Sequence, residues 1–276
     1  MDEAKYFETI AQYKLLAKKE VGQNFLIDRS IAKRIVDAAI INPEDKVLEI
    51  GSGAGSLSYF LSLSQGRADL IDIDPGLVAK LQSDFSKCPN IRVFQQNALK
   101  ADISEYTKII GNLPYYITSS LIEKCLLDAK SCRRFVFMVQ KEAADRILSS
   151  PGSKDYGPLS ILVSISCKAD VLLKVPSSSF VPAPRVESAV VALERNDLDI
   201  EEARRTYRFA TNCFRQRRKT LLNNLKPELG KKAEEFILGF GIDPKSRPEE
   251  LKPEAYLAFA LSLIHISEPT RQAEIS

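Results

Sequence analysis

Three glycines that directly follow an apolar run constrain the fold of this 276-residue chain more than any other feature. The run is Lys46–Ile50, and the glycines are Gly51, Gly53 and Gly55. Residues without a side chain let the backbone approach a ligand closely, where a Cβ would clash. The pattern predicts a nucleotide-type cofactor site at the end of a strand.

Two cofactor classes compete for this glycine loop. A dinucleotide fingerprint has the spacing Gly-x-Gly-x-x-Gly, which would place its last glycine at the position of Ser56. The third glycine is instead Gly55, and this closer spacing favours S-adenosylmethionine, which has no pyrophosphate to cradle. A plain tight turn is the alternative without a ligand.

The acid expected to bind the ribose of such a cofactor is Asp72, which ends the next apolar run. A carboxylate in this place accepts hydrogen bonds from both ribose hydroxyls. Asp74 precedes Pro75, so we interpret Asp74 as the cap of a helix that Pro75 begins.

Apolar runs alternate with amphipathic stretches in the part of the chain that contains the glycine loop. The expected strands are Lys46–Ile50, Arg67–Asp72, Ile91–Gln95, Lys108–Gly111 and Phe135–Val139. Leu77–Phe85 and Ser119–Ala129 are expected helices between them. This alternation predicts an α/β fold with a doubly wound, Rossmann-like sheet, whose ligands bind at the carboxyl ends of the strands.

The chain is expected to divide at the polar segment Arg195–Glu202. We predict a cofactor-binding domain with an N-terminal leader over residues 1–195, a small α-helical domain over 196–263, and a disordered or non-native tail over 264–276. Within the first domain, the apolar, β-branched run Leu159–Val175 and the run Ala189–Leu193 are strand-like.

Positive charge is concentrated in the second domain. Residues 204–232 contain ten Lys and Arg against one acid, Glu228, although the whole chain carries a net charge of only +3. We expect Arg204 to Lys219 to be helical, with one face packed on apolar residues and the other presented to RNA phosphates. The candidate RNA-binding residues are Arg215, Arg217, Arg218 and Lys219.

The segment Asn112-Leu113-Pro114-Tyr115 follows the fourth expected strand. An exocyclic adenine amine is a poor nucleophile because its lone pair is delocalised into the ring. Two acceptors placed against its two hydrogens draw the nitrogen toward tetrahedral geometry and direct the lone pair at a sulfonium methyl group. The Asn112 side-chain oxygen and a nearby backbone carbonyl are the expected acceptors, while Tyr115 or Tyr116 stacks on the base.

Together these motifs resemble the small-subunit ribosomal RNA adenine N6,N6-dimethyltransferase family over about residues 18–258. The matching segments are Lys19-Glu-Val-Gly-Gln-Asn-Phe-Leu26, Glu49-Ile-Gly-Ser-Gly-Ala-Gly55, Asn112-Leu-Pro-Tyr115, Phe180-Val-Pro-Ala-Pro-Arg-Val-Glu-Ser188 and Phe214-Arg-Gln-Arg-Arg-Lys-Thr-Leu221. The resemblance implies a class I methyltransferase fold and S-adenosylmethionine-dependent dimethylation of two adjacent adenosines in a terminal hairpin of small-subunit ribosomal RNA, often in a preassembled 30S-like particle.

The resemblance also implies roles for individual residues. It places Asn24, Leu26, Gly51, Asp72, Asn97 and Asn112 in contact with the cofactor, and Phe180 and Tyr115 beside the flipped adenine. Two positions depart from the family pattern, which commonly has Glu at Asp72 and Asp at Asn97. Both keep an acceptor oxygen, so we expect retained activity and hypothesise that Asn97 accepts from the cofactor's amino group.

Two other functions stay open on the sequence. A large-subunit RNA adenine methyltransferase of the antibiotic-resistance type shares the glycine loop and a similar Asn-x-Pro-Tyr motif, and a non-catalytic ribosome assembly factor could keep the fold. The basic segment favours the small-subunit family, and the intact motif at Asn112 favours catalysis. We expect a cytoplasmic monomer without a membrane segment or a metal site, since the five cysteines are widely spaced and the single histidine is His265.

Overall fold

The computed structural model describes residues 2–12 and 23–273, with side chains as far as residue 263. The chain divides into two compact units, Met1–Ala144 with Ala169–Arg195, and Asp145–Lys168 with Asn196–Ser276. We call them the sheet unit and the helical unit. The sequence analysis assigned residues 145–168 to the first domain, whereas the structure groups them with the C-terminal helices.

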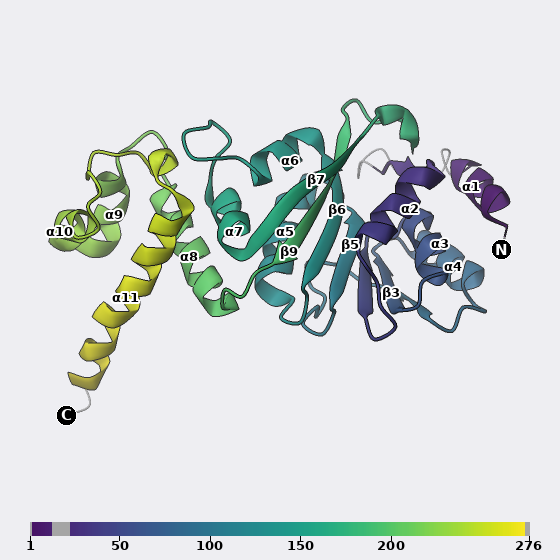
Figure 1. Ribbon diagram of the computed structural model, residues 1–276, viewed down its shortest axis with the longest axis horizontal. Helices are drawn as coiled ribbons and strands as arrows, with labels where there is room; N and C mark the ends of the chain where they lie inside the picture. Colours follow the sequence, from purple (N-terminus) through teal and green to yellow (C-terminus); the bar gives the residue numbers. More distant parts are fainter. Residues whose placement is uncertain (1, 13–22, 274–276) are drawn as a thin grey trace. The chain divides into compact units, whose positions relative to one another are not determined.

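A seven-stranded sheet forms the centre of the sheet unit, with strand order β4-β3-β2-β5-β6-β9-β7 (Figure 1). The strands are β2 Lys46–Ile50, β3 Arg67–Asp72, β4 Ile91–Gln95, β5 Lys108–Asn112, β6 Arg134–Gln140, β7 Cys167–Val175 and β9 Ser188–Arg195. Strands β2 to β6 pair in parallel, and β9 pairs antiparallel with β6. The predicted α/β fold class is confirmed, and β5 extends one residue further than expected, to Asn112.

Helices connect these strands, and a two-stranded sheet lies beside them. The helices are α1 Glu3–Gln12, α2 Arg29–Ala38, α3 Ser56–Ser62, α4 Pro75–Asp84, α5 Thr118–Asp128 and α6 Lys141–Ile147, and the small sheet pairs β1 Phe25–Leu26 with β8 Phe180–Val181. Asp74 caps α4 as predicted, because its Oδ1 accepts from the backbone N–H of Gly76 at 2.9 Å.

One face of the sheet packs against the N-terminal helices. Val47, Leu70 and Ile110 lie on this face and are fully buried in the same core as the apolar side chains of α1 to α4. Burial of each such side chain stabilises the fold by about 1.5–3 kcal/mol. Glu49 pairs with Leu70 and Ile110 in the sheet register, so an acid projects into this apolar face.

Aromatic rings fill the core of the helical unit. Its helices are α7 Pro158–Ser166, α8 Ile200–Cys213, α9 Leu221–Leu229, α10 Ala233–Leu238 and α11 Pro253–Ala273. Phe209 and Phe259 lie with ring centroids 5.5 Å apart, and Tyr256 is fully buried in the same cluster. These rings supply the apolar area that a small helical unit needs.

Three segments differ from the sequence-based expectation. The run from Leu159 begins as α7, because Pro158 fits the first turn of a helix and an apolar run alone does not distinguish helix from strand. Helix α11 continues to Ala273, through the segment expected to be a disordered tail. The segment Arg204 to Lys219 was expected to be helical throughout, but α8 ends at Cys213, and the rest of the segment forms a turn before α9.

A backbone hydrogen bond and a helix cap help to define this turn. The N–H of Lys219 donates to the carbonyl of Gln216 at 2.8 Å, and Thr220 caps α9 by accepting from the N–H of Asn223. A capping Thr favours a new helix start over continuation of the preceding helix. In the described part of the chain, no helix has the length and apolar character needed to cross a membrane.

Candidate cofactor and base site

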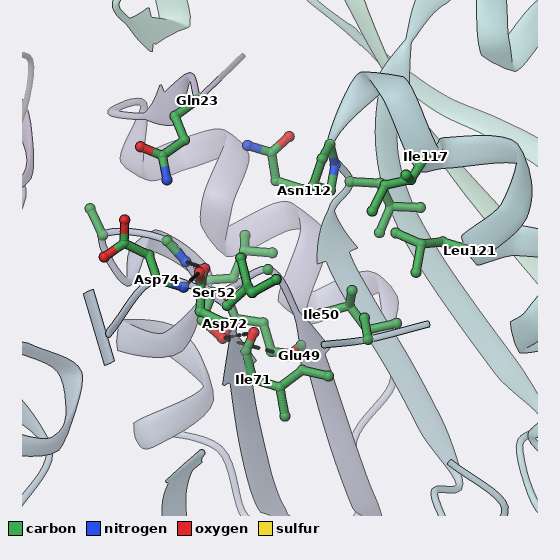
Figure 2. Close-up of a pocket in the computed structure, with 18 of the residues that line it drawn as sticks. Gln23, Glu49, Ile50, Ser52, Ile71, Asp72, Asp74, Asn112, Ile117 and Leu121 are labelled. Carbon is green, nitrogen blue, oxygen red and sulfur yellow. Dashed lines mark hydrogen bonds between the residues drawn. The ribbon is translucent and has the colours of Figure 1, made fainter. Parts of the chain in front are cut away.

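A cavity of about 340 Å³ lies at the carboxyl ends of the central strands. Figure 2 shows side chains from several segments around the same space. The lining residues include the N-terminal segment Gln23–Leu26, the glycine loop, the end of β3 with Asp72 and Asp74, residues 96–99, and residues 112–117. The structure therefore brings together all of the predicted cofactor-binding residues except Gly55, which is absent from the lining.

The glycine loop has the backbone conformation that its residues allow. Gly51, Gly53 and Gly55 have φ angles of 68°, 54° and 95°. At Gly55, an added Cβ would collide with the Tyr6 hydroxyl and with Leu81. Gly55 therefore shapes the loop from behind, where helices α1 and α4 pack against it.

Two side chains from these helices bind the loop backbone at Ala54. Lys80 donates to the Ala54 carbonyl at 3.0 Å, and the Tyr6 hydroxyl lies 3.4 Å from the same oxygen. The Lys80 ammonium also pairs with Asp84 and lies 4.8 Å from the Tyr6 ring centroid. Tyr6 and Lys80 are not predictable from the sequence, because nothing in the local pattern links them to the loop.

Asp72 is fixed by backbone groups on both sides. Its Oδ2 accepts from the N–H of Gly53 at 2.8 Å, and its Oδ1 accepts from the N–H of Asp74 at 2.9 Å. Burial raises the pKa of the Asp72 carboxyl, while these hydrogen bonds oppose the rise. A carboxylate can accept about four hydrogen bonds, and backbone N–H groups of Gly53, Asp74 and Ile73 already bond to this one, so an acceptor position remains for a ribose hydroxyl.

Glu49 is another acid that lines the cavity, and in the sequence it appears only as part of the glycine-loop motif. Its carboxyl accepts from the Ser58 hydroxyl at 2.6 Å, and the residue is 2% exposed. Burial raises the pKa of Glu49 to about 8, and the charge of Asp72 adds to the rise. The signal for it in the sequence is a lone acid within an apolar strand, between Leu48 and Ile50.

The Asn112 side chain has a defined orientation at the end of β5. Its Nδ2 donates to the carbonyl of Asn24 at 3.2 Å, which leaves Oδ1 as the acceptor. Strands β5 and β2 pack closely just before Asn112, since a Cβ at Gly111 would lie 2.6 Å from the Ile50 carbonyl oxygen. This close packing positions Asn112 at the cavity.

The backbone after Asn112 supplies a second acceptor. The Pro114 carbonyl already accepts from the Thr118 hydroxyl at 3.0 Å and from the N–H of Ile117. The N–H of Leu113 donates to Met138, whereas no donor among the described residues bonds the Leu113 carbonyl. Asn112 Oδ1 and the Leu113 carbonyl are thus two neighbouring acceptors, the arrangement that a planar amine requires.

The two candidate stacking tyrosines differ in their surroundings. The Tyr115 hydroxyl lies 3.5 Å from the Ser188 hydroxyl, and burial raises its pKa. Tyr116 is 67% exposed, although both residues line the cavity. Tyr115 is therefore the more fixed ring.

Phe180 does not line the cavity in this structure. It is 2% exposed, and its backbone pairs with Leu26 where β8 meets β1. Leu26 in turn lines the cavity, and its carbonyl accepts from the Ser56 hydroxyl at the start of α3. Phe180 thus supports the wall that Leu26 forms.

Asn97 lines the cavity near Leu99, but its oxygen is already engaged. Its Oδ1 accepts from the N–H of Leu99 at 2.9 Å. The side-chain nitrogen is then the other polar group that Asn97 can offer. An amino group of a ligand would have to share the oxygen with Leu99.

The four candidate RNA-binding residues lie in the turn between α8 and α9 of the helical unit. Arg215, Arg218 and Lys219 are exposed, while Arg217 is partly buried. The Arg217 guanidinium donates to the carbonyl of Ser153 at 3.0 Å. Three of the four side chains are therefore accessible to a ligand, whereas that of Arg217 is held by the protein.

The profile of the ribosomal RNA adenine dimethylase family matches residues 14–265. The chain is 37% identical to the ribosomal RNA small subunit methyltransferase A of Geobacillus sp. (strain WCH70), covering 94% of this chain and 96% of that protein. It is 38% identical to the protein of the same name from Malacoplasma penetrans (strain HF-2), covering 93% and 95%.

Solved structures agree with this relationship. A dimethyladenosine transferase from Plasmodium falciparum superposes with a TM-score of 0.73 at 26% identity, covering 86% of this chain and 96% of that one. The 23S rRNA methyltransferase ErmE superposes with a TM-score of 0.65, also at 26% identity, covering 86% and 98%. With a profile match over most of its length and an arrangement of acceptors suited to an adenine amine, the chain belongs to the ribosomal RNA adenine dimethylase family.

Proposed function

We propose that the protein transfers methyl groups from S-adenosylmethionine to the N6 amines of two adjacent adenosines in a 3'-terminal hairpin of small-subunit ribosomal RNA. The observation that carries the proposal is the pair of acceptors at the end of β5, Asn112 Oδ1 and the Leu113 carbonyl. The relatives named as small-subunit methyltransferases support the choice of RNA.

The donor set of the cavity fits S-adenosylmethionine. Asp72 keeps an acceptor position for a ribose hydroxyl, the glycine loop lines the cavity, and Asn97 with Leu99 would hold the adenine ring. Asn24 and Leu26 close the other side, next to Asn112. When bound, this cofactor supplies an electrophilic methyl group.

The residues of this chain then orient the nucleophile. Each of the two acceptors accepts a hydrogen bond from one N–H of the adenine amine. Together they hold the lone pair of the nitrogen toward the methyl group. Tyr115 stacks on the base, and such a contact contributes about 1–3 kcal/mol. Pro114 restricts the backbone between the Leu113 carbonyl and the Tyr115 ring. Phe180 acts through its strand pairing with Leu26 in our proposal, so its effect on the base is indirect.

The proposal includes the form of the substrate and of the enzyme. We expect the enzyme to act as a cytoplasmic monomer without a metal ion and to prefer a 30S-like particle to naked RNA. Exposed Arg and Lys of the helical unit would contact phosphates in either form.

Mass spectrometry of ribosomal RNA tests the proposal. Unmethylated small-subunit particles, naked small-subunit RNA and large-subunit RNA are each incubated with the enzyme and labelled S-adenosylmethionine. We expect dimethyladenosine at two adjacent positions in small-subunit RNA, and far less of it with the Asn112→Ala variant over the same incubation time. Label in large-subunit RNA alone would favour the function in the name of the ErmE structure, and no label in any RNA would favour a non-catalytic assembly factor.

A further inference from the structure

The basic turn, residues Phe214–Thr220, is a defined structure and not a frayed helix end. Its centre is a four-residue turn in which the N–H of Lys219 donates to the carbonyl of Gln216 at 2.8 Å. Arg217 and Arg218 occupy the two middle positions of this turn. Their side chains therefore leave the backbone in directions that the turn fixes.

One buried side chain holds this turn from the following helix. Asn224 of α9 is 6% exposed, and its Oδ1 accepts from the N–H of Gln216 at 2.9 Å. Its Nδ2 donates to the carbonyls of Gln216 at 3.2 Å and Thr220 at 3.1 Å, and it lies 3.5 Å from that of Lys219. A single carboxamide thus pairs with both backbone groups of Gln216 and closes the far end of the turn.

Arg217 is turned toward the body of the helical unit. Besides its hydrogen bond to the Ser153 carbonyl, its Nε lies 3.9 Å from Glu249 Oε2. That oxygen is buried and has no hydrogen-bond partner among the described residues, so the guanidinium compensates its charge. Three basic side chains, Arg215, Arg218 and Lys219, remain exposed.

We propose that Asn224 is a positioning residue that preforms a phosphate-binding turn. In this turn Arg215, Arg218 and Lys219 contact the RNA backbone, and Arg217 serves the structure of the turn. The identity of the ligand as small-subunit ribosomal RNA rests on the proposed function. The physical reason is preorganisation: charges on a fixed backbone reach several phosphates at once without the entropic cost of ordering that backbone on binding.

A substitution of Asn224 that leaves the net charge unchanged tests whether this residue affects RNA binding by positioning the turn. The probe is an unmethylated transcript of the 3'-terminal hairpin of small-subunit ribosomal RNA, bound at a series of salt concentrations. We expect Asn224→Ala to weaken binding about tenfold at low salt and to lower the salt slope by about one, although no charge is lost. KM for RNA should rise while kcat and the affinity for S-adenosylhomocysteine stay unchanged.

A neighbouring position provides the matched control. Asn223 is exposed on the same helix, so Asn223→Ala should leave both affinity and salt slope unchanged. The pair Asn224→Asp and Asn223→Asp adds the same charge at adjacent positions, and Asn224→Asp keeps the shape of the buried group while removing its donors. We expect the larger loss of RNA affinity at position 224. Asn224→Asp keeps the test decisive if Asn224→Ala does not fold.

A reference variant distinguishes failure of this inference from failure of the proposed RNA surface. Arg218→Gln should lower the salt slope by about one without lowering the thermal midpoint, whereas Arg217→Gln should lower the midpoint. If Arg218→Gln changes the slope and the two Asn224 variants behave like their Asn223 counterparts, the positioning role is wrong. If Arg218→Gln leaves the slope unchanged, the turn does not bind RNA, and the inference fails with the surface on which it rests.

Discussion

The glycine loop and the basic turn present their ligand-binding groups in opposite ways. In the loop, the groups at the cavity are a short stretch of backbone and buried acids, and neighbours hold both, since Lys80 donates to the Ala54 carbonyl and the N–H of Gly53 donates to Asp72. In the turn, the groups are long exposed side chains, and only the backbone beneath them is held, by Asn224.

This difference predicts two kinds of response to mutation. In our proposal the loop contacts the cofactor directly, so a change of one atom in or behind it should have large effects that are insensitive to salt. The turn is proposed to make several phosphate contacts, so a change that removes one of them should have graded effects that disappear at high salt.

The largest effect on activity is expected at Asn112, which is proposed to lie between the cofactor and the adenine. In Asn112→Ala, the loss of one of two acceptors for the amine should lower kcat by about 10²–10³-fold, the range found when one preorganised hydrogen-bonding group is removed. Single-turnover methylation at saturating RNA and cofactor measures this step.

The control for Asn112 is the exposed ring at the rim of the same cavity. Tyr116→Ala should change kcat only a few-fold, since Tyr116 is 67% exposed and Tyr115 is the more fixed ring. Equal losses in the two variants would show that the cavity tolerates no change at all and that Asn112 has no special role.

The second largest effect is expected at Gly55, where Tyr6 and Leu81 pack against the glycine loop. Gly55→Ala places a side chain at a φ of 95° and against the Tyr6 hydroxyl. Such strain costs about 1–3 kcal/mol, and we expect roughly tenfold weaker binding of S-adenosylhomocysteine by calorimetry, with no change in the salt slope of RNA binding.

A second substitution sharpens this prediction. Tyr6→Phe removes the oxygen that collides with the new Cβ, so the double variant should recover part of the lost affinity. Leu81 remains in contact, and recovery should be incomplete. Strict additivity of the two substitutions would mean that Tyr6 does not press on the loop.

The sequence predicted the loop better than the turn, for a physical reason. Glycine spacing and strand alternation are local patterns, so β2, β3 and β4 and the cap at Asp74 could be read directly. The turn depends on a buried contact between Asn224 and Gln216, eight residues apart, and a basic, amphipathic segment gives no sign of it. Tyr6 and Lys80 were missed for the same reason, because their partner lies far along the chain.

The third prediction concerns the buried acid of the sheet unit. The pKa of Glu49 is raised to about 8 by burial, above its value in an unfolded chain. Between about pH 4.5 and 8 the folded state therefore binds more protons than the unfolded state, and this group makes stability fall as pH rises, by at most about 1.4 kcal/mol per pH unit.

Chemical denaturation at several pH values checks this sign. The Glu49→Gln variant keeps a polar group near Ser58 without the titration, so its stability should fall less between pH 5 and 8 than that of the native chain. Parallel curves for the two proteins would rule out Glu49 as the titrating group. RNA binding by the basic turn should be the same in both.

The smallest effect is expected at the adenine end of the cavity. Asn97→Asp keeps an acceptor for the N–H of Leu99 and replaces the side-chain nitrogen by a second acceptor, which suits an amino group better. We expect S-adenosylhomocysteine to bind roughly two- to tenfold more tightly, the equivalent of one added hydrogen bond. An analogue of S-adenosylhomocysteine that lacks the amino group of its adenine should show no gain in affinity, because it has no donor for the new oxygen. An equal gain with both ligands would place Asn97 away from the amino group, and a gain that vanished at high salt would make this end of the cavity respond like the basic turn.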